Sequence, residues 1–399
     1  MSKLTVKDIP AEGKRVFVRV DFNVPLSPEG RVLDDTKIRA SLPTIRYLLE
    51  KGSRLILASH LGRPKGKVVE ALRMDPVAER LSRLLGREVL KSNTVVGEEV
   101  VRAVEALKPG DILLLENIRF EAGEEKNDPQ FAAALARLAD FYVNDAFGTA
   151  HRAHASTNGI SRFLPAVAGL LMEKEIVYLY KSRENPPSPL VAILGGKKVA
   201  DKIGVIRHFM GHADSLLLGG AMANTFLKAR GYVMGSSFYE EDKLDLAREI
   251  LEEAPKNQAR IYLPSDVVIV EELRARSPFK VVKAENIPEG WSAVDIGPET
   301  VDTFQKAIHG AKMIIWNGPL GAYEFPPFHK GTEMVARSIA AAKAESIVGG
   351  GDIVAALEEL GLSDQITHLS TGGGAVLEFW EGKELPGLTV LQEHSLTGI

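Results

Sequence analysis

Short, uninterrupted apolar runs alternate with segments of helical periodicity along this chain. In the first half the runs are "RVFVRV" (15–20), "RLILAS" (54–59), "DILLLE" (111–116) and "FYVND" (141–145). Helical patterns lie between them, such as "IRASLPTIRYLLEKG" (38–52) and "DPVAERLSRLLG" (75–86), and Gly86 closes the second. The second half repeats the alternation with "PLVAIL" (189–194), "DSLLLG" (214–219), "RIYLP" (260–264), "AKMIIW" (311–316) and "ESIVGG" (345–350). Continuous apolar strands alternating with helices predict an α/β fold with parallel sheets covered on both faces.

A boundary is expected near the middle of the chain. "GLLMEKEIVYLYKSRE" (169–184) has the pattern of one helix and is followed by the breaker "NPPSP" (185–189). The length of 399 residues suggests two or three domains. The sequence thus predicts an amino-terminal domain (1–170), a connecting helix and hinge (171–187), a carboxy-terminal domain (188–385) and a tail (386–399) that packs back on the amino-terminal domain.

Composition and charge narrow the function classes. The net charge of −4 creates no field that would attract nucleic acid or an acidic membrane surface, so any anion must be captured by local charge. There is no cysteine, which excludes disulfides and thiolate metal sites and fits a reducing cytoplasm. The first residues show no apolar core of a secretory signal, and no run reaches the roughly 18 apolar residues of a membrane span.

Polar residues and glycines gather where the predicted strands end. Parallel sheets bind ligands beyond these carboxyl ends. In the first half the ends supply Asp21, Asn23, His60, Arg63, Arg119, His151, Arg152 and His154. In the second half they read "GGKK", "GGAM", "WNGP", "GGGD" and "STGGGA". Glycine lets a backbone approach a ligand, and helix N-termini then direct N–H groups at phosphate. One half is therefore expected to form a basic pocket for a small anion and the other a glycine-lined nucleotide cleft.

The stretch "LGGKKVADKIG" (194–204) places several lysines after one of these strands. Lys198 and Lys202 are four residues apart and are expected to share a helix face just past a helix start, where cations oppose the helix dipole unless an anion lies between them. A solvated helix face is the alternative for the lysines, and helix caps or core positions are equally open for His151 and His154. No P-loop, protein-kinase motif set or dinucleotide fingerprint is present.

The chain resembles the phosphoglycerate kinase family over nearly its whole length. The motifs are "RVDFNVPL", "SHLGRPKG", "GEEKNDP", "NDAFGTAHRAHAS", "AGLLMEKE", "DKIGVI", "LGGAM", "WNGP", "VGGGD" and "STGGGA", in the family's order. The resemblance implies two doubly wound, Rossmann-like lobes joined by a hinge helix. It also implies a monomer that transfers a phosphoryl group from 1,3-bisphosphoglycerate to Mg-ADP, giving 3-phosphoglycerate and ATP, by direct in-line transfer after the lobes close. No nucleic acid or membrane partner is expected.

The resemblance also implies roles for individual residues. Asp21, Asn23, His60, Arg63, Arg119 and Arg152 would bind the phosphoglycerate. The transferring group would be contacted by Lys37, Lys198, Gly372 and Gly373. The nucleotide would be bound by Lys202, Gly219, Gly220, Asn317, Pro319, Glu324, Gly350, Gly351, Asp352 and Thr371. Asp352 would also hold Mg²⁺, a hard cation that prefers carboxylate and phosphate oxygens.

Five positions depart from the family pattern. Lys37 stands where the family has its main catalytic arginine, and Lys197 stands where a small residue is usual. Asn224 replaces an aromatic residue, and Ile353 and Val376 replace Ser or Thr. We expect Lys37 to lie in the loop before the helix at 38–52 and the last three departures, Asn224, Ile353 and Val376, to alter contacts around the nucleotide cleft. Two alternatives stay open: a catalytically weakened family member with a ligand-binding role, and a kinase for another small metabolite.

Overall fold

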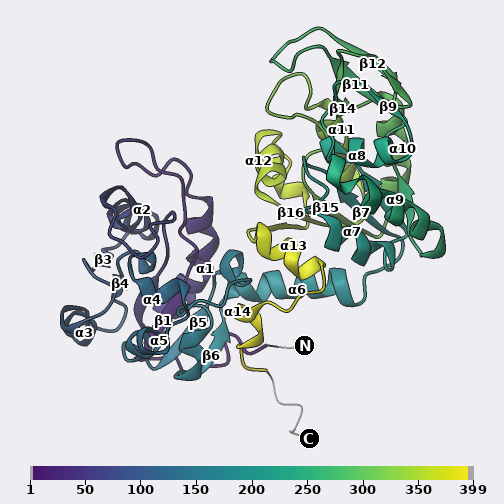
Figure 1. The fold of residues 1–399 in the computed structure, drawn as a ribbon. Coiled ribbons are helices and arrows are strands. Elements are labelled where there is room, and N and C mark those ends of the chain that lie inside the picture. The colour runs from purple at the N-terminus through teal and green to yellow at the C-terminus, as the bar shows by residue number, and fades with distance from the viewer. Residues whose placement is uncertain (1–2, 394–399) are drawn as a thin grey trace, which may run out of the picture. The chain divides into compact units, whose positions relative to one another are not determined.

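The computed structural model describes residues 3–393 and divides into two compact units. The amino-terminal unit runs up to Val177 and includes the segment from Glu384 onward, and the carboxy-terminal unit is Tyr178–Lys383. Helix α6 (Leu170–Glu184) contains the point of division, and the helix predicted over 169–184 is thereby confirmed. Figure 1 shows the elements of each unit along the chain.

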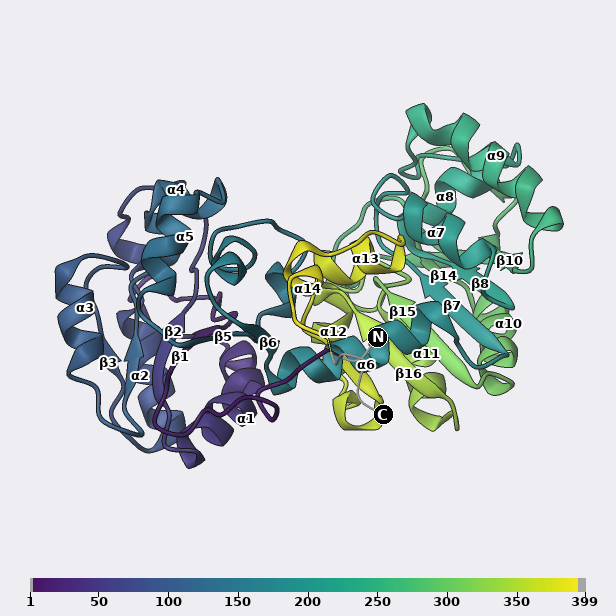
Figure 2. The same ribbon diagram turned by 90° about the horizontal axis from the view of Figure 1, so that it is seen from below.

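The amino-terminal unit is built on a six-stranded parallel sheet. Its order is β3-β4-β2-β1-β5-β6, with bounds Leu90–Lys91, Ile112–Leu114, Arg54–Ala58, Arg15–Arg19, Phe141–Asn144 and Ala166–Ala168. Alternate strand residues such as Val16 and Leu57 pack against α1 (Thr36–Glu50) and α2 (Asp75–Leu85) in one core. In Figure 2, α4 (Ala122–Glu125) and α5 (Pro129–Ala136) lie on the sheet face opposite α1. Helix α3 is Glu98–Glu105.

The end of the described chain is bound to this same unit. After α14 (Pro386–Thr389), the Gln392 N–H donates to the Ala166 carbonyl at 2.9 Å, and the Gln392 carbonyl accepts from Leu4 N–H at 2.8 Å. Asn144 Nδ2 donates to the Gly387 carbonyl at 3.0 Å. Residues 394–399 of the predicted tail lie outside the described residues.

The carboxy-terminal unit has a second six-stranded parallel sheet. Its order is β10-β8-β7-β15-β16-β17, with bounds Arg260–Tyr262, Ser215–Leu218, Leu190–Leu194, Met313–Asn317, Glu345–Gly349 and His368–Ser370. Buried residues of β15, including Ile314 and Trp316, share a core with α10 (Pro298–His309), α11 (Lys330–Ala341) and α12 (Gly351–Glu359). The remaining helices of this unit are α7 (Ile203–Met210), α8 (Gly220–Ala229), α9 (Leu244–Glu253) and α13 (Gly374–Trp380). The two parallel sheets confirm the predicted fold class.

Two small sheets complete this unit and were not predicted. An antiparallel sheet has the order β12-β11-β14 (Phe279–Lys283, Asp266–Val270 and Ser292–Ile296), and β13 (Asn286–Ile287) pairs with β9 (Val233–Met234). They share a separate apolar cluster that includes Leu227, Val267 and Ile287. None of the helices within residues 3–393 combines the length and the apolar character that a membrane crossing requires.

Candidate active site

A polar cavity of about 200 Å³ lies beyond the carboxyl ends of β1, β2, β4 and β5. In this sheet the connections change direction between β1 and β5, the kind of switch point at which parallel sheets bind ligands. All seven residues predicted for the amino-terminal site line the cavity: Asp21, Asn23, Lys37, His60, Arg63, Arg119 and Arg152. Gly62, Gly148 and Thr149 also line it and were not predicted, although they lie within the quoted motifs "SHLGRPKG" and "NDAFGTAHRAHAS".

Side-chain to backbone hydrogen bonds fix the loops that carry these groups. Asn23 Oδ1 accepts from the Gly62 N–H at 2.8 Å, which ties the loop after β1 to the loop after β2. Buried Asn117 binds both backbone groups of Leu61, through Oδ1 at 3.2 Å and Nδ2 at 2.7 Å. Hydrogen bonds between loops can fix their conformations even though the loops bury no hydrophobic core of their own. His60, between them, is therefore positioned from both sides.

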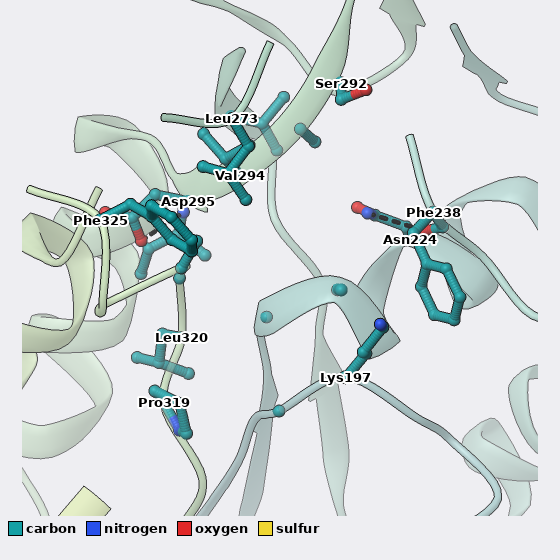
Figure 3. A pocket seen from close by; sticks show the side chains of 18 of the residues that line it. Lys197, Asn224, Phe238, Leu273, Ser292, Val294, Asp295, Pro319, Leu320 and Phe325 are labelled. Atoms are coloured by element: carbon teal, nitrogen blue, oxygen red, sulfur yellow. Dashed lines mark hydrogen bonds between the residues drawn. The ribbon is translucent and has the colours of Figure 1, made fainter. Parts of the chain in front are cut away.

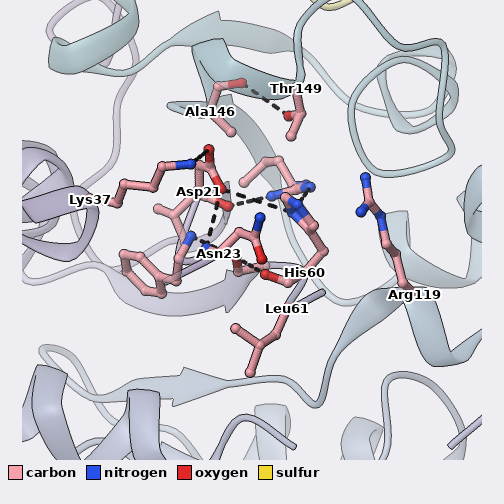
Figure 4. A network of polar contacts seen from close by, with 12 residues as sticks. Asp21, Asn23, Lys37, His60, Leu61, Arg119, Ala146 and Thr149 are labelled. Carbon is pink, nitrogen blue, oxygen red and sulfur yellow. Dashed lines mark hydrogen bonds and ion pairs between the residues drawn. The ribbon is translucent and has the colours of Figure 1, made fainter. Parts of the chain in front are cut away.

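Lys37 faces this cavity from a helix and not from a loop. It is the second residue of α1, so the predicted loop position was wrong. Its Nζ donates to Asp21 Oδ2 at 3.0 Å, as Figure 4 shows. Arg39, two residues on, is turned elsewhere and pairs with Asp35 at 2.8 Å. The helix thus directs Lys37 and not Arg39 at the site.

Burial and crowded charge shape the electrostatics of the pocket. Burial alone would raise the pKa of Asp21, but the positive charge around it, which includes Lys37 and Arg19, outweighs that effect and lowers the pKa. Burial, with the nearby cations Arg152 and Arg19, lowers the pKa of Arg119 to about 10. The Arg119 side chain donates to the Gly62 carbonyl through Nη1 at 2.9 Å, whereas its buried Nη2 has no hydrogen-bond partner among the described residues. A donor held in this way suits an anionic oxygen in the cavity.

The two histidines left open by the sequence do not line this cavity. His154 lies in the loop after β5, with Nδ1 3.7 Å from Glu124 Oε1. Burial and the cations Arg119, Arg19 and Arg152 lower the pKa of His154 to about 4, so it is neutral near pH 7. His151 Nε2 accepts from Arg152 Nε at 3.2 Å, which helps to orient that guanidinium.

A larger cavity of about 680 Å³ lies in the carboxy-terminal unit, where the strand connections change direction between β7 and β15. Four predicted nucleotide-binding residues line it: Gly220, Pro319, Glu324 and Asp352. Apolar side chains that the sequence did not single out supply much of its wall, and they include Phe238, Leu273, Val294 and Phe325 (Figure 3). Val294 comes from β14, one of the strands that were missed.

The floor of this cavity requires glycine. Gly220 has a φ of +67°, and a Cβ there would lie 2.6 Å from the Gly196 carbonyl oxygen and 2.9 Å from that of Pro319. A larger residue would therefore separate the ends of β7, β8 and β15. Because these strand ends approach closely, backbone atoms form part of the cavity surface. A flat apolar ring can lie against this backbone.

Three helices begin beside the strand ends of the six-stranded sheet of this unit with glycine and no side-chain cap. They are α8, α12 and α13, whose N-caps are Gly219, Gly350 and Gly373. The first N–H groups of such helices have no intrahelical acceptor and favour anions. Gly351 and Asp352 form the first turn of α12, and Gly372 N–H donates to Ser370 Oγ at 3.1 Å. Thr371 lies between Ser370 and Gly372.

The lysines of the 194–204 stretch precede the helix. Helix α7 begins at Ile203 with Lys202 as its N-cap, so the predicted shared helix face of Lys198 and Lys202 was wrong. Lys202 Nζ donates to Asn317 Oδ1, and Asn317 Nδ2 donates to the Gly349 carbonyl. Burial lowers the pKa of Lys202 to about 8, although nearby Asp201 and Asp352 oppose the shift.

The departures at the nucleotide side fall into two groups. Lys197 and Asn224 line the cavity, with Lys197 Nζ 5.0 Å from the centroid of the Phe238 ring and Asn224 Nδ2 donating to the Phe238 carbonyl at 3.1 Å. Ile353 and Val376 are instead fully buried and do not line it, so an effect of these two on contacts around the cleft would act through packing.

Comparisons with known proteins agree with this two-site architecture. A sequence model of the family described as "Phosphoglycerate kinase" matches residues 6–383. A curated phosphoglycerate kinase of Moorella thermoacetica is 57% identical over 393 residues, which cover 98% of this chain and all of that protein. Among solved structures, phosphoglycerate kinase from Coxiella burnetii has a TM-score of 0.89 at 40% identity, covering 97% of this chain and 98% of its own. That from Pyrococcus horikoshii has a TM-score of 0.85 at 33% identity, with the same coverage.

The family match spans both units and their cavities. The Moorella protein is similar over the whole chain, so the similarity is not limited to one shared domain. The chain therefore belongs to the phosphoglycerate kinase family, the ATP-binding transferases of glycolysis that move a phosphoryl group between ATP and the carboxyl group of 3-phosphoglycerate.

Proposed function

We propose that the amino-terminal cavity binds 3-phosphoglycerate or 1,3-bisphosphoglycerate and that the carboxy-terminal cavity binds ADP or ATP. The observation that carries the first assignment is the lining of one small cavity by Arg63, Arg119 and Arg152 together with His60 and Lys37. Arginine forks bind carboxylate and phosphate in pairs of hydrogen bonds. The Asp21 carboxylate would accept a hydrogen bond from the glycerate hydroxyl, and the Asn23 amide nitrogen would donate one to the glycerate.

The apolar wall and polar rim of the larger cavity support the second assignment. Pro319 and Leu320 line one side and Gly220 and Ala221 another, which leaves an apolar slot for an adenine ring. Glu324 would bind the ribose hydroxyls. The uncapped N-termini of α12 and α13 would receive the phosphates, with Gly350, Gly351, Gly372, Gly373 and Thr371 around them.

Asp352 is the residue that we expect to hold Mg²⁺. Its carboxylate lines the nucleotide cavity in the first turn of α12, and a hard oxygen donor suits this cation. Within residues 3–393 no group of three acidic or histidine side chains could hold a metal, so phosphate oxygens and water would complete the shell. When bound, Mg²⁺ would neutralise charge on the nucleotide phosphates.

In the proposed reaction, a β-phosphate oxygen of ADP attacks the acyl phosphate of 1,3-bisphosphoglycerate. The new P–O bond forms as the bond to the carboxyl oxygen breaks, and 3-phosphoglycerate leaves as a carboxylate. Lys37, Lys198 and the N–H groups of Gly372 and Gly373 stabilise negative charge on the three oxygens in flight. No covalent enzyme intermediate is required. A catalytically weakened protein is the less favoured alternative, because Lys37 retains a cation at the pocket.

We further propose that the two lobes act as a monomer in the cytoplasm, with the segment around α6 as the hinge. Each reactant has a site in a different unit, so direct transfer requires the units to bring them together and exclude water.

Lys198→Ala should lower kcat by about 10²–10³ with little change in the KM for ATP, because it removes charge directed at the transferring group. Lys197→Ala is the matched control, since its ammonium lies over the Phe238 ring and the family has a small residue there. A coupled assay with ADP and 1,3-bisphosphoglycerate measures both. Near-normal kcat in Lys198→Ala with a raised KM for ATP would contradict the assignment, and no turnover in the wild-type protein would overturn the proposed function.

Lys37→Arg should raise kcat by about tenfold, which corresponds to roughly 1.4 kcal/mol of barrier. A planar guanidinium can hold two phosphoryl oxygens at once, whereas an ammonium is a compact, strongly hydrated charge. Steady-state kinetics should show little change in KM for either substrate. Arg39→Ala should leave kcat unaltered, because Arg39 pairs with Asp35 on an exposed surface. An unchanged Lys37→Arg together with an inactive Arg39→Ala would reverse the two roles.

Nucleotide affinity should fall as pH rises through about 8, where the Lys202 ammonium of the free enzyme loses its proton. Phosphate stabilises the charged form, so binding takes up a proton above this pH, and the dissociation constant should rise by up to about tenfold per pH unit. Titration calorimetry in buffers of different ionisation enthalpy measures that uptake. Lys202→Arg keeps its charge and should show no uptake from the side chain, and equal uptake in both proteins would count against Lys202.

Both substrates together should reduce the radius of gyration measured by small-angle X-ray scattering, whereas each substrate alone should change it less. The reason is that closure gains its full stabilisation only when both reactants are bound. A radius that stays the same in the ternary complex would exclude hinge closure for this chain.

A further inference from the structure

A guanidinium that does not line the anion cavity lies directly behind it. Arg19 is the last residue of β1 and is fully buried. Its Nε donates to Ser156 Oγ at 2.9 Å, its Nη1 donates to the Val20 carbonyl, and its Nη2 lies 3.3 Å from Nδ1 of His60. His60 itself lines the cavity, so Arg19 is linked to the site through that imidazole.

The contact between Arg19 and His60 determines where the imidazole proton lies. A guanidinium has five N–H donors, has no acceptor and stays protonated in proteins. Nδ1 of His60 must therefore accept, and the proton of a neutral ring must be on Nε2. Nδ1 faces the buried guanidinium, so Nε2 is the nitrogen left to the cavity.

Asp21 is the group that could favour the opposite tautomer. Its Oδ1 lies 4.0 Å from His60 Nδ1, which is too long for a hydrogen bond. That oxygen accepts from the Asn23 N–H at 3.2 Å, and Oδ2 accepts from Lys37 Nζ at 3.0 Å. Asp21 is thus engaged on both oxygens, and Arg19 is the closer partner of Nδ1.

A buried carboxylate compensates the charge of Arg19. Ser156 Oγ accepts from Arg19 and donates to Glu124 Oε1 at 2.7 Å, while the Ser156 N–H donates to Oε2 at 3.0 Å. Glu124 is fully buried in α4. A continuous chain of hydrogen bonds therefore runs from Glu124 through Ser156 and Arg19 to His60, and each side-chain nitrogen of Arg19 has an acceptor.

We propose that Arg19 is a positioning residue that fixes His60 as the neutral tautomer with its proton on Nε2, so that His60 donates a hydrogen bond to the anion in the cavity. The tautomer itself depends only on the protein. The role toward phosphoglycerate rests on the proposed function.

The charges around His60 favour this neutral form. Burial, together with Arg19, Arg119 and Lys37, keeps the pKa of His60 well below its usual 6.5, although Asp21 opposes the shift. These groups come from β1, the turn after β4, α1 and the loop after β1. A neutral donor recognises an oxygen of the anion without adding a further cation to this crowded pocket.

Nuclear magnetic resonance of the unliganded, full-length enzyme tests the tautomer directly. Long-range proton–nitrogen correlations distinguish protonated from unprotonated ring nitrogens, and His60→Gln identifies the His60 signals among the nine histidines. We expect unprotonated Nδ1 and protonated Nε2 from about pH 6 to about pH 8. A proton on Nδ1 in this range, on either the neutral ring or the imidazolium, would overturn the proposal.

Arg19→Met tests whether Arg19 is the cause, because it retains an apolar stem and removes the donors. Nδ1 should then gain a proton facing Asp21, and the dissociation constant for 3-phosphoglycerate should rise by about tenfold or more. Arg19→Lys retains a donor and should keep protonated Nε2. Retention of the wild-type tautomer in Arg19→Met would overturn the assignment to Arg19.

Tyr142→Phe is the control for disturbance of the fold. Tyr142 is fully buried in β5, the strand that pairs with β1, and its hydroxyl lies 3.4 Å from the Thr157 carbonyl. This variant should lower stability while leaving the His60 tautomer unchanged. If Arg19→Met does not fold, the wild-type spectrum and Arg19→Lys still decide the proposal. Absence of 3-phosphoglycerate binding by the wild-type enzyme would refute the proposed function but would leave the tautomer measurement intact.

Discussion

Two arginines, Arg19 and Arg119, are buried near the carboxyl ends of the strands of the amino-terminal sheet. Only 0% and 2% of these residues are exposed to solvent. Desolvation makes this arrangement costly, and the low pKa of Arg119 is its electrostatic signature. The negative charges of Glu124 and Asp21 offset part of the cost at Arg19, and Glu124 is linked to Arg19 by hydrogen bonds through Ser156. The remaining positive potential is available to a ligand, so binding an oxyanion relieves a repulsion that the fold maintains.

In the proposed function, the carboxy-terminal unit binds a polyphosphate by different means. The donors that it would offer are chiefly neutral backbone N–H groups at the uncapped starts of α8, α12 and α13, and Lys202 is a half-buried cation whose pKa burial lowers. Neutral dipoles cost less to desolvate than charges and are already oriented. The need for backbone at the surface explains Gly220, whose φ and crowded surroundings admit no side chain. Both units thus have a cavity beyond the carboxyl ends of parallel strands. We propose that one attracts its anion with charged side chains and the other with peptide dipoles.

The strands that the sequence predicted are those whose apolar runs are long enough to stand out, and both sheets follow from them. Strands β3, β6 and β17 have only two or three residues and were not predicted, whereas the equally short β4 stood out because it lies within the longer run "DILLLE". The amino-terminal pocket could be predicted because parallel strands bring their carboxyl ends together, whatever the distance along the chain. The four-residue spacing of Lys198 and Lys202 misled because the glycines before them and the late start of α7 leave both lysines outside the helix interior. Arg19 was not singled out as a site residue, because its position within the strand "RVFVRV" gives no sign that it contacts His60.

The five departures from the family pattern fall into two groups, those that line a cavity and those that are buried, and the two groups can affect different things. Lys37, Lys197 and Asn224 line cavities, so they are placed where a bound ligand would contact them directly. Val376 acts through packing, because its Cγ1 lies 2.8 Å from the place that a Cβ on Gly349 would occupy, at the strand end that accepts from Asn317. A polar residue at Val376 would lack the apolar contacts of that site and would need a hydrogen-bond partner in the core. A buried departure such as Val376 can therefore affect where the strand ends lie. Lys37, by contrast, changes which cation faces the amino-terminal cavity.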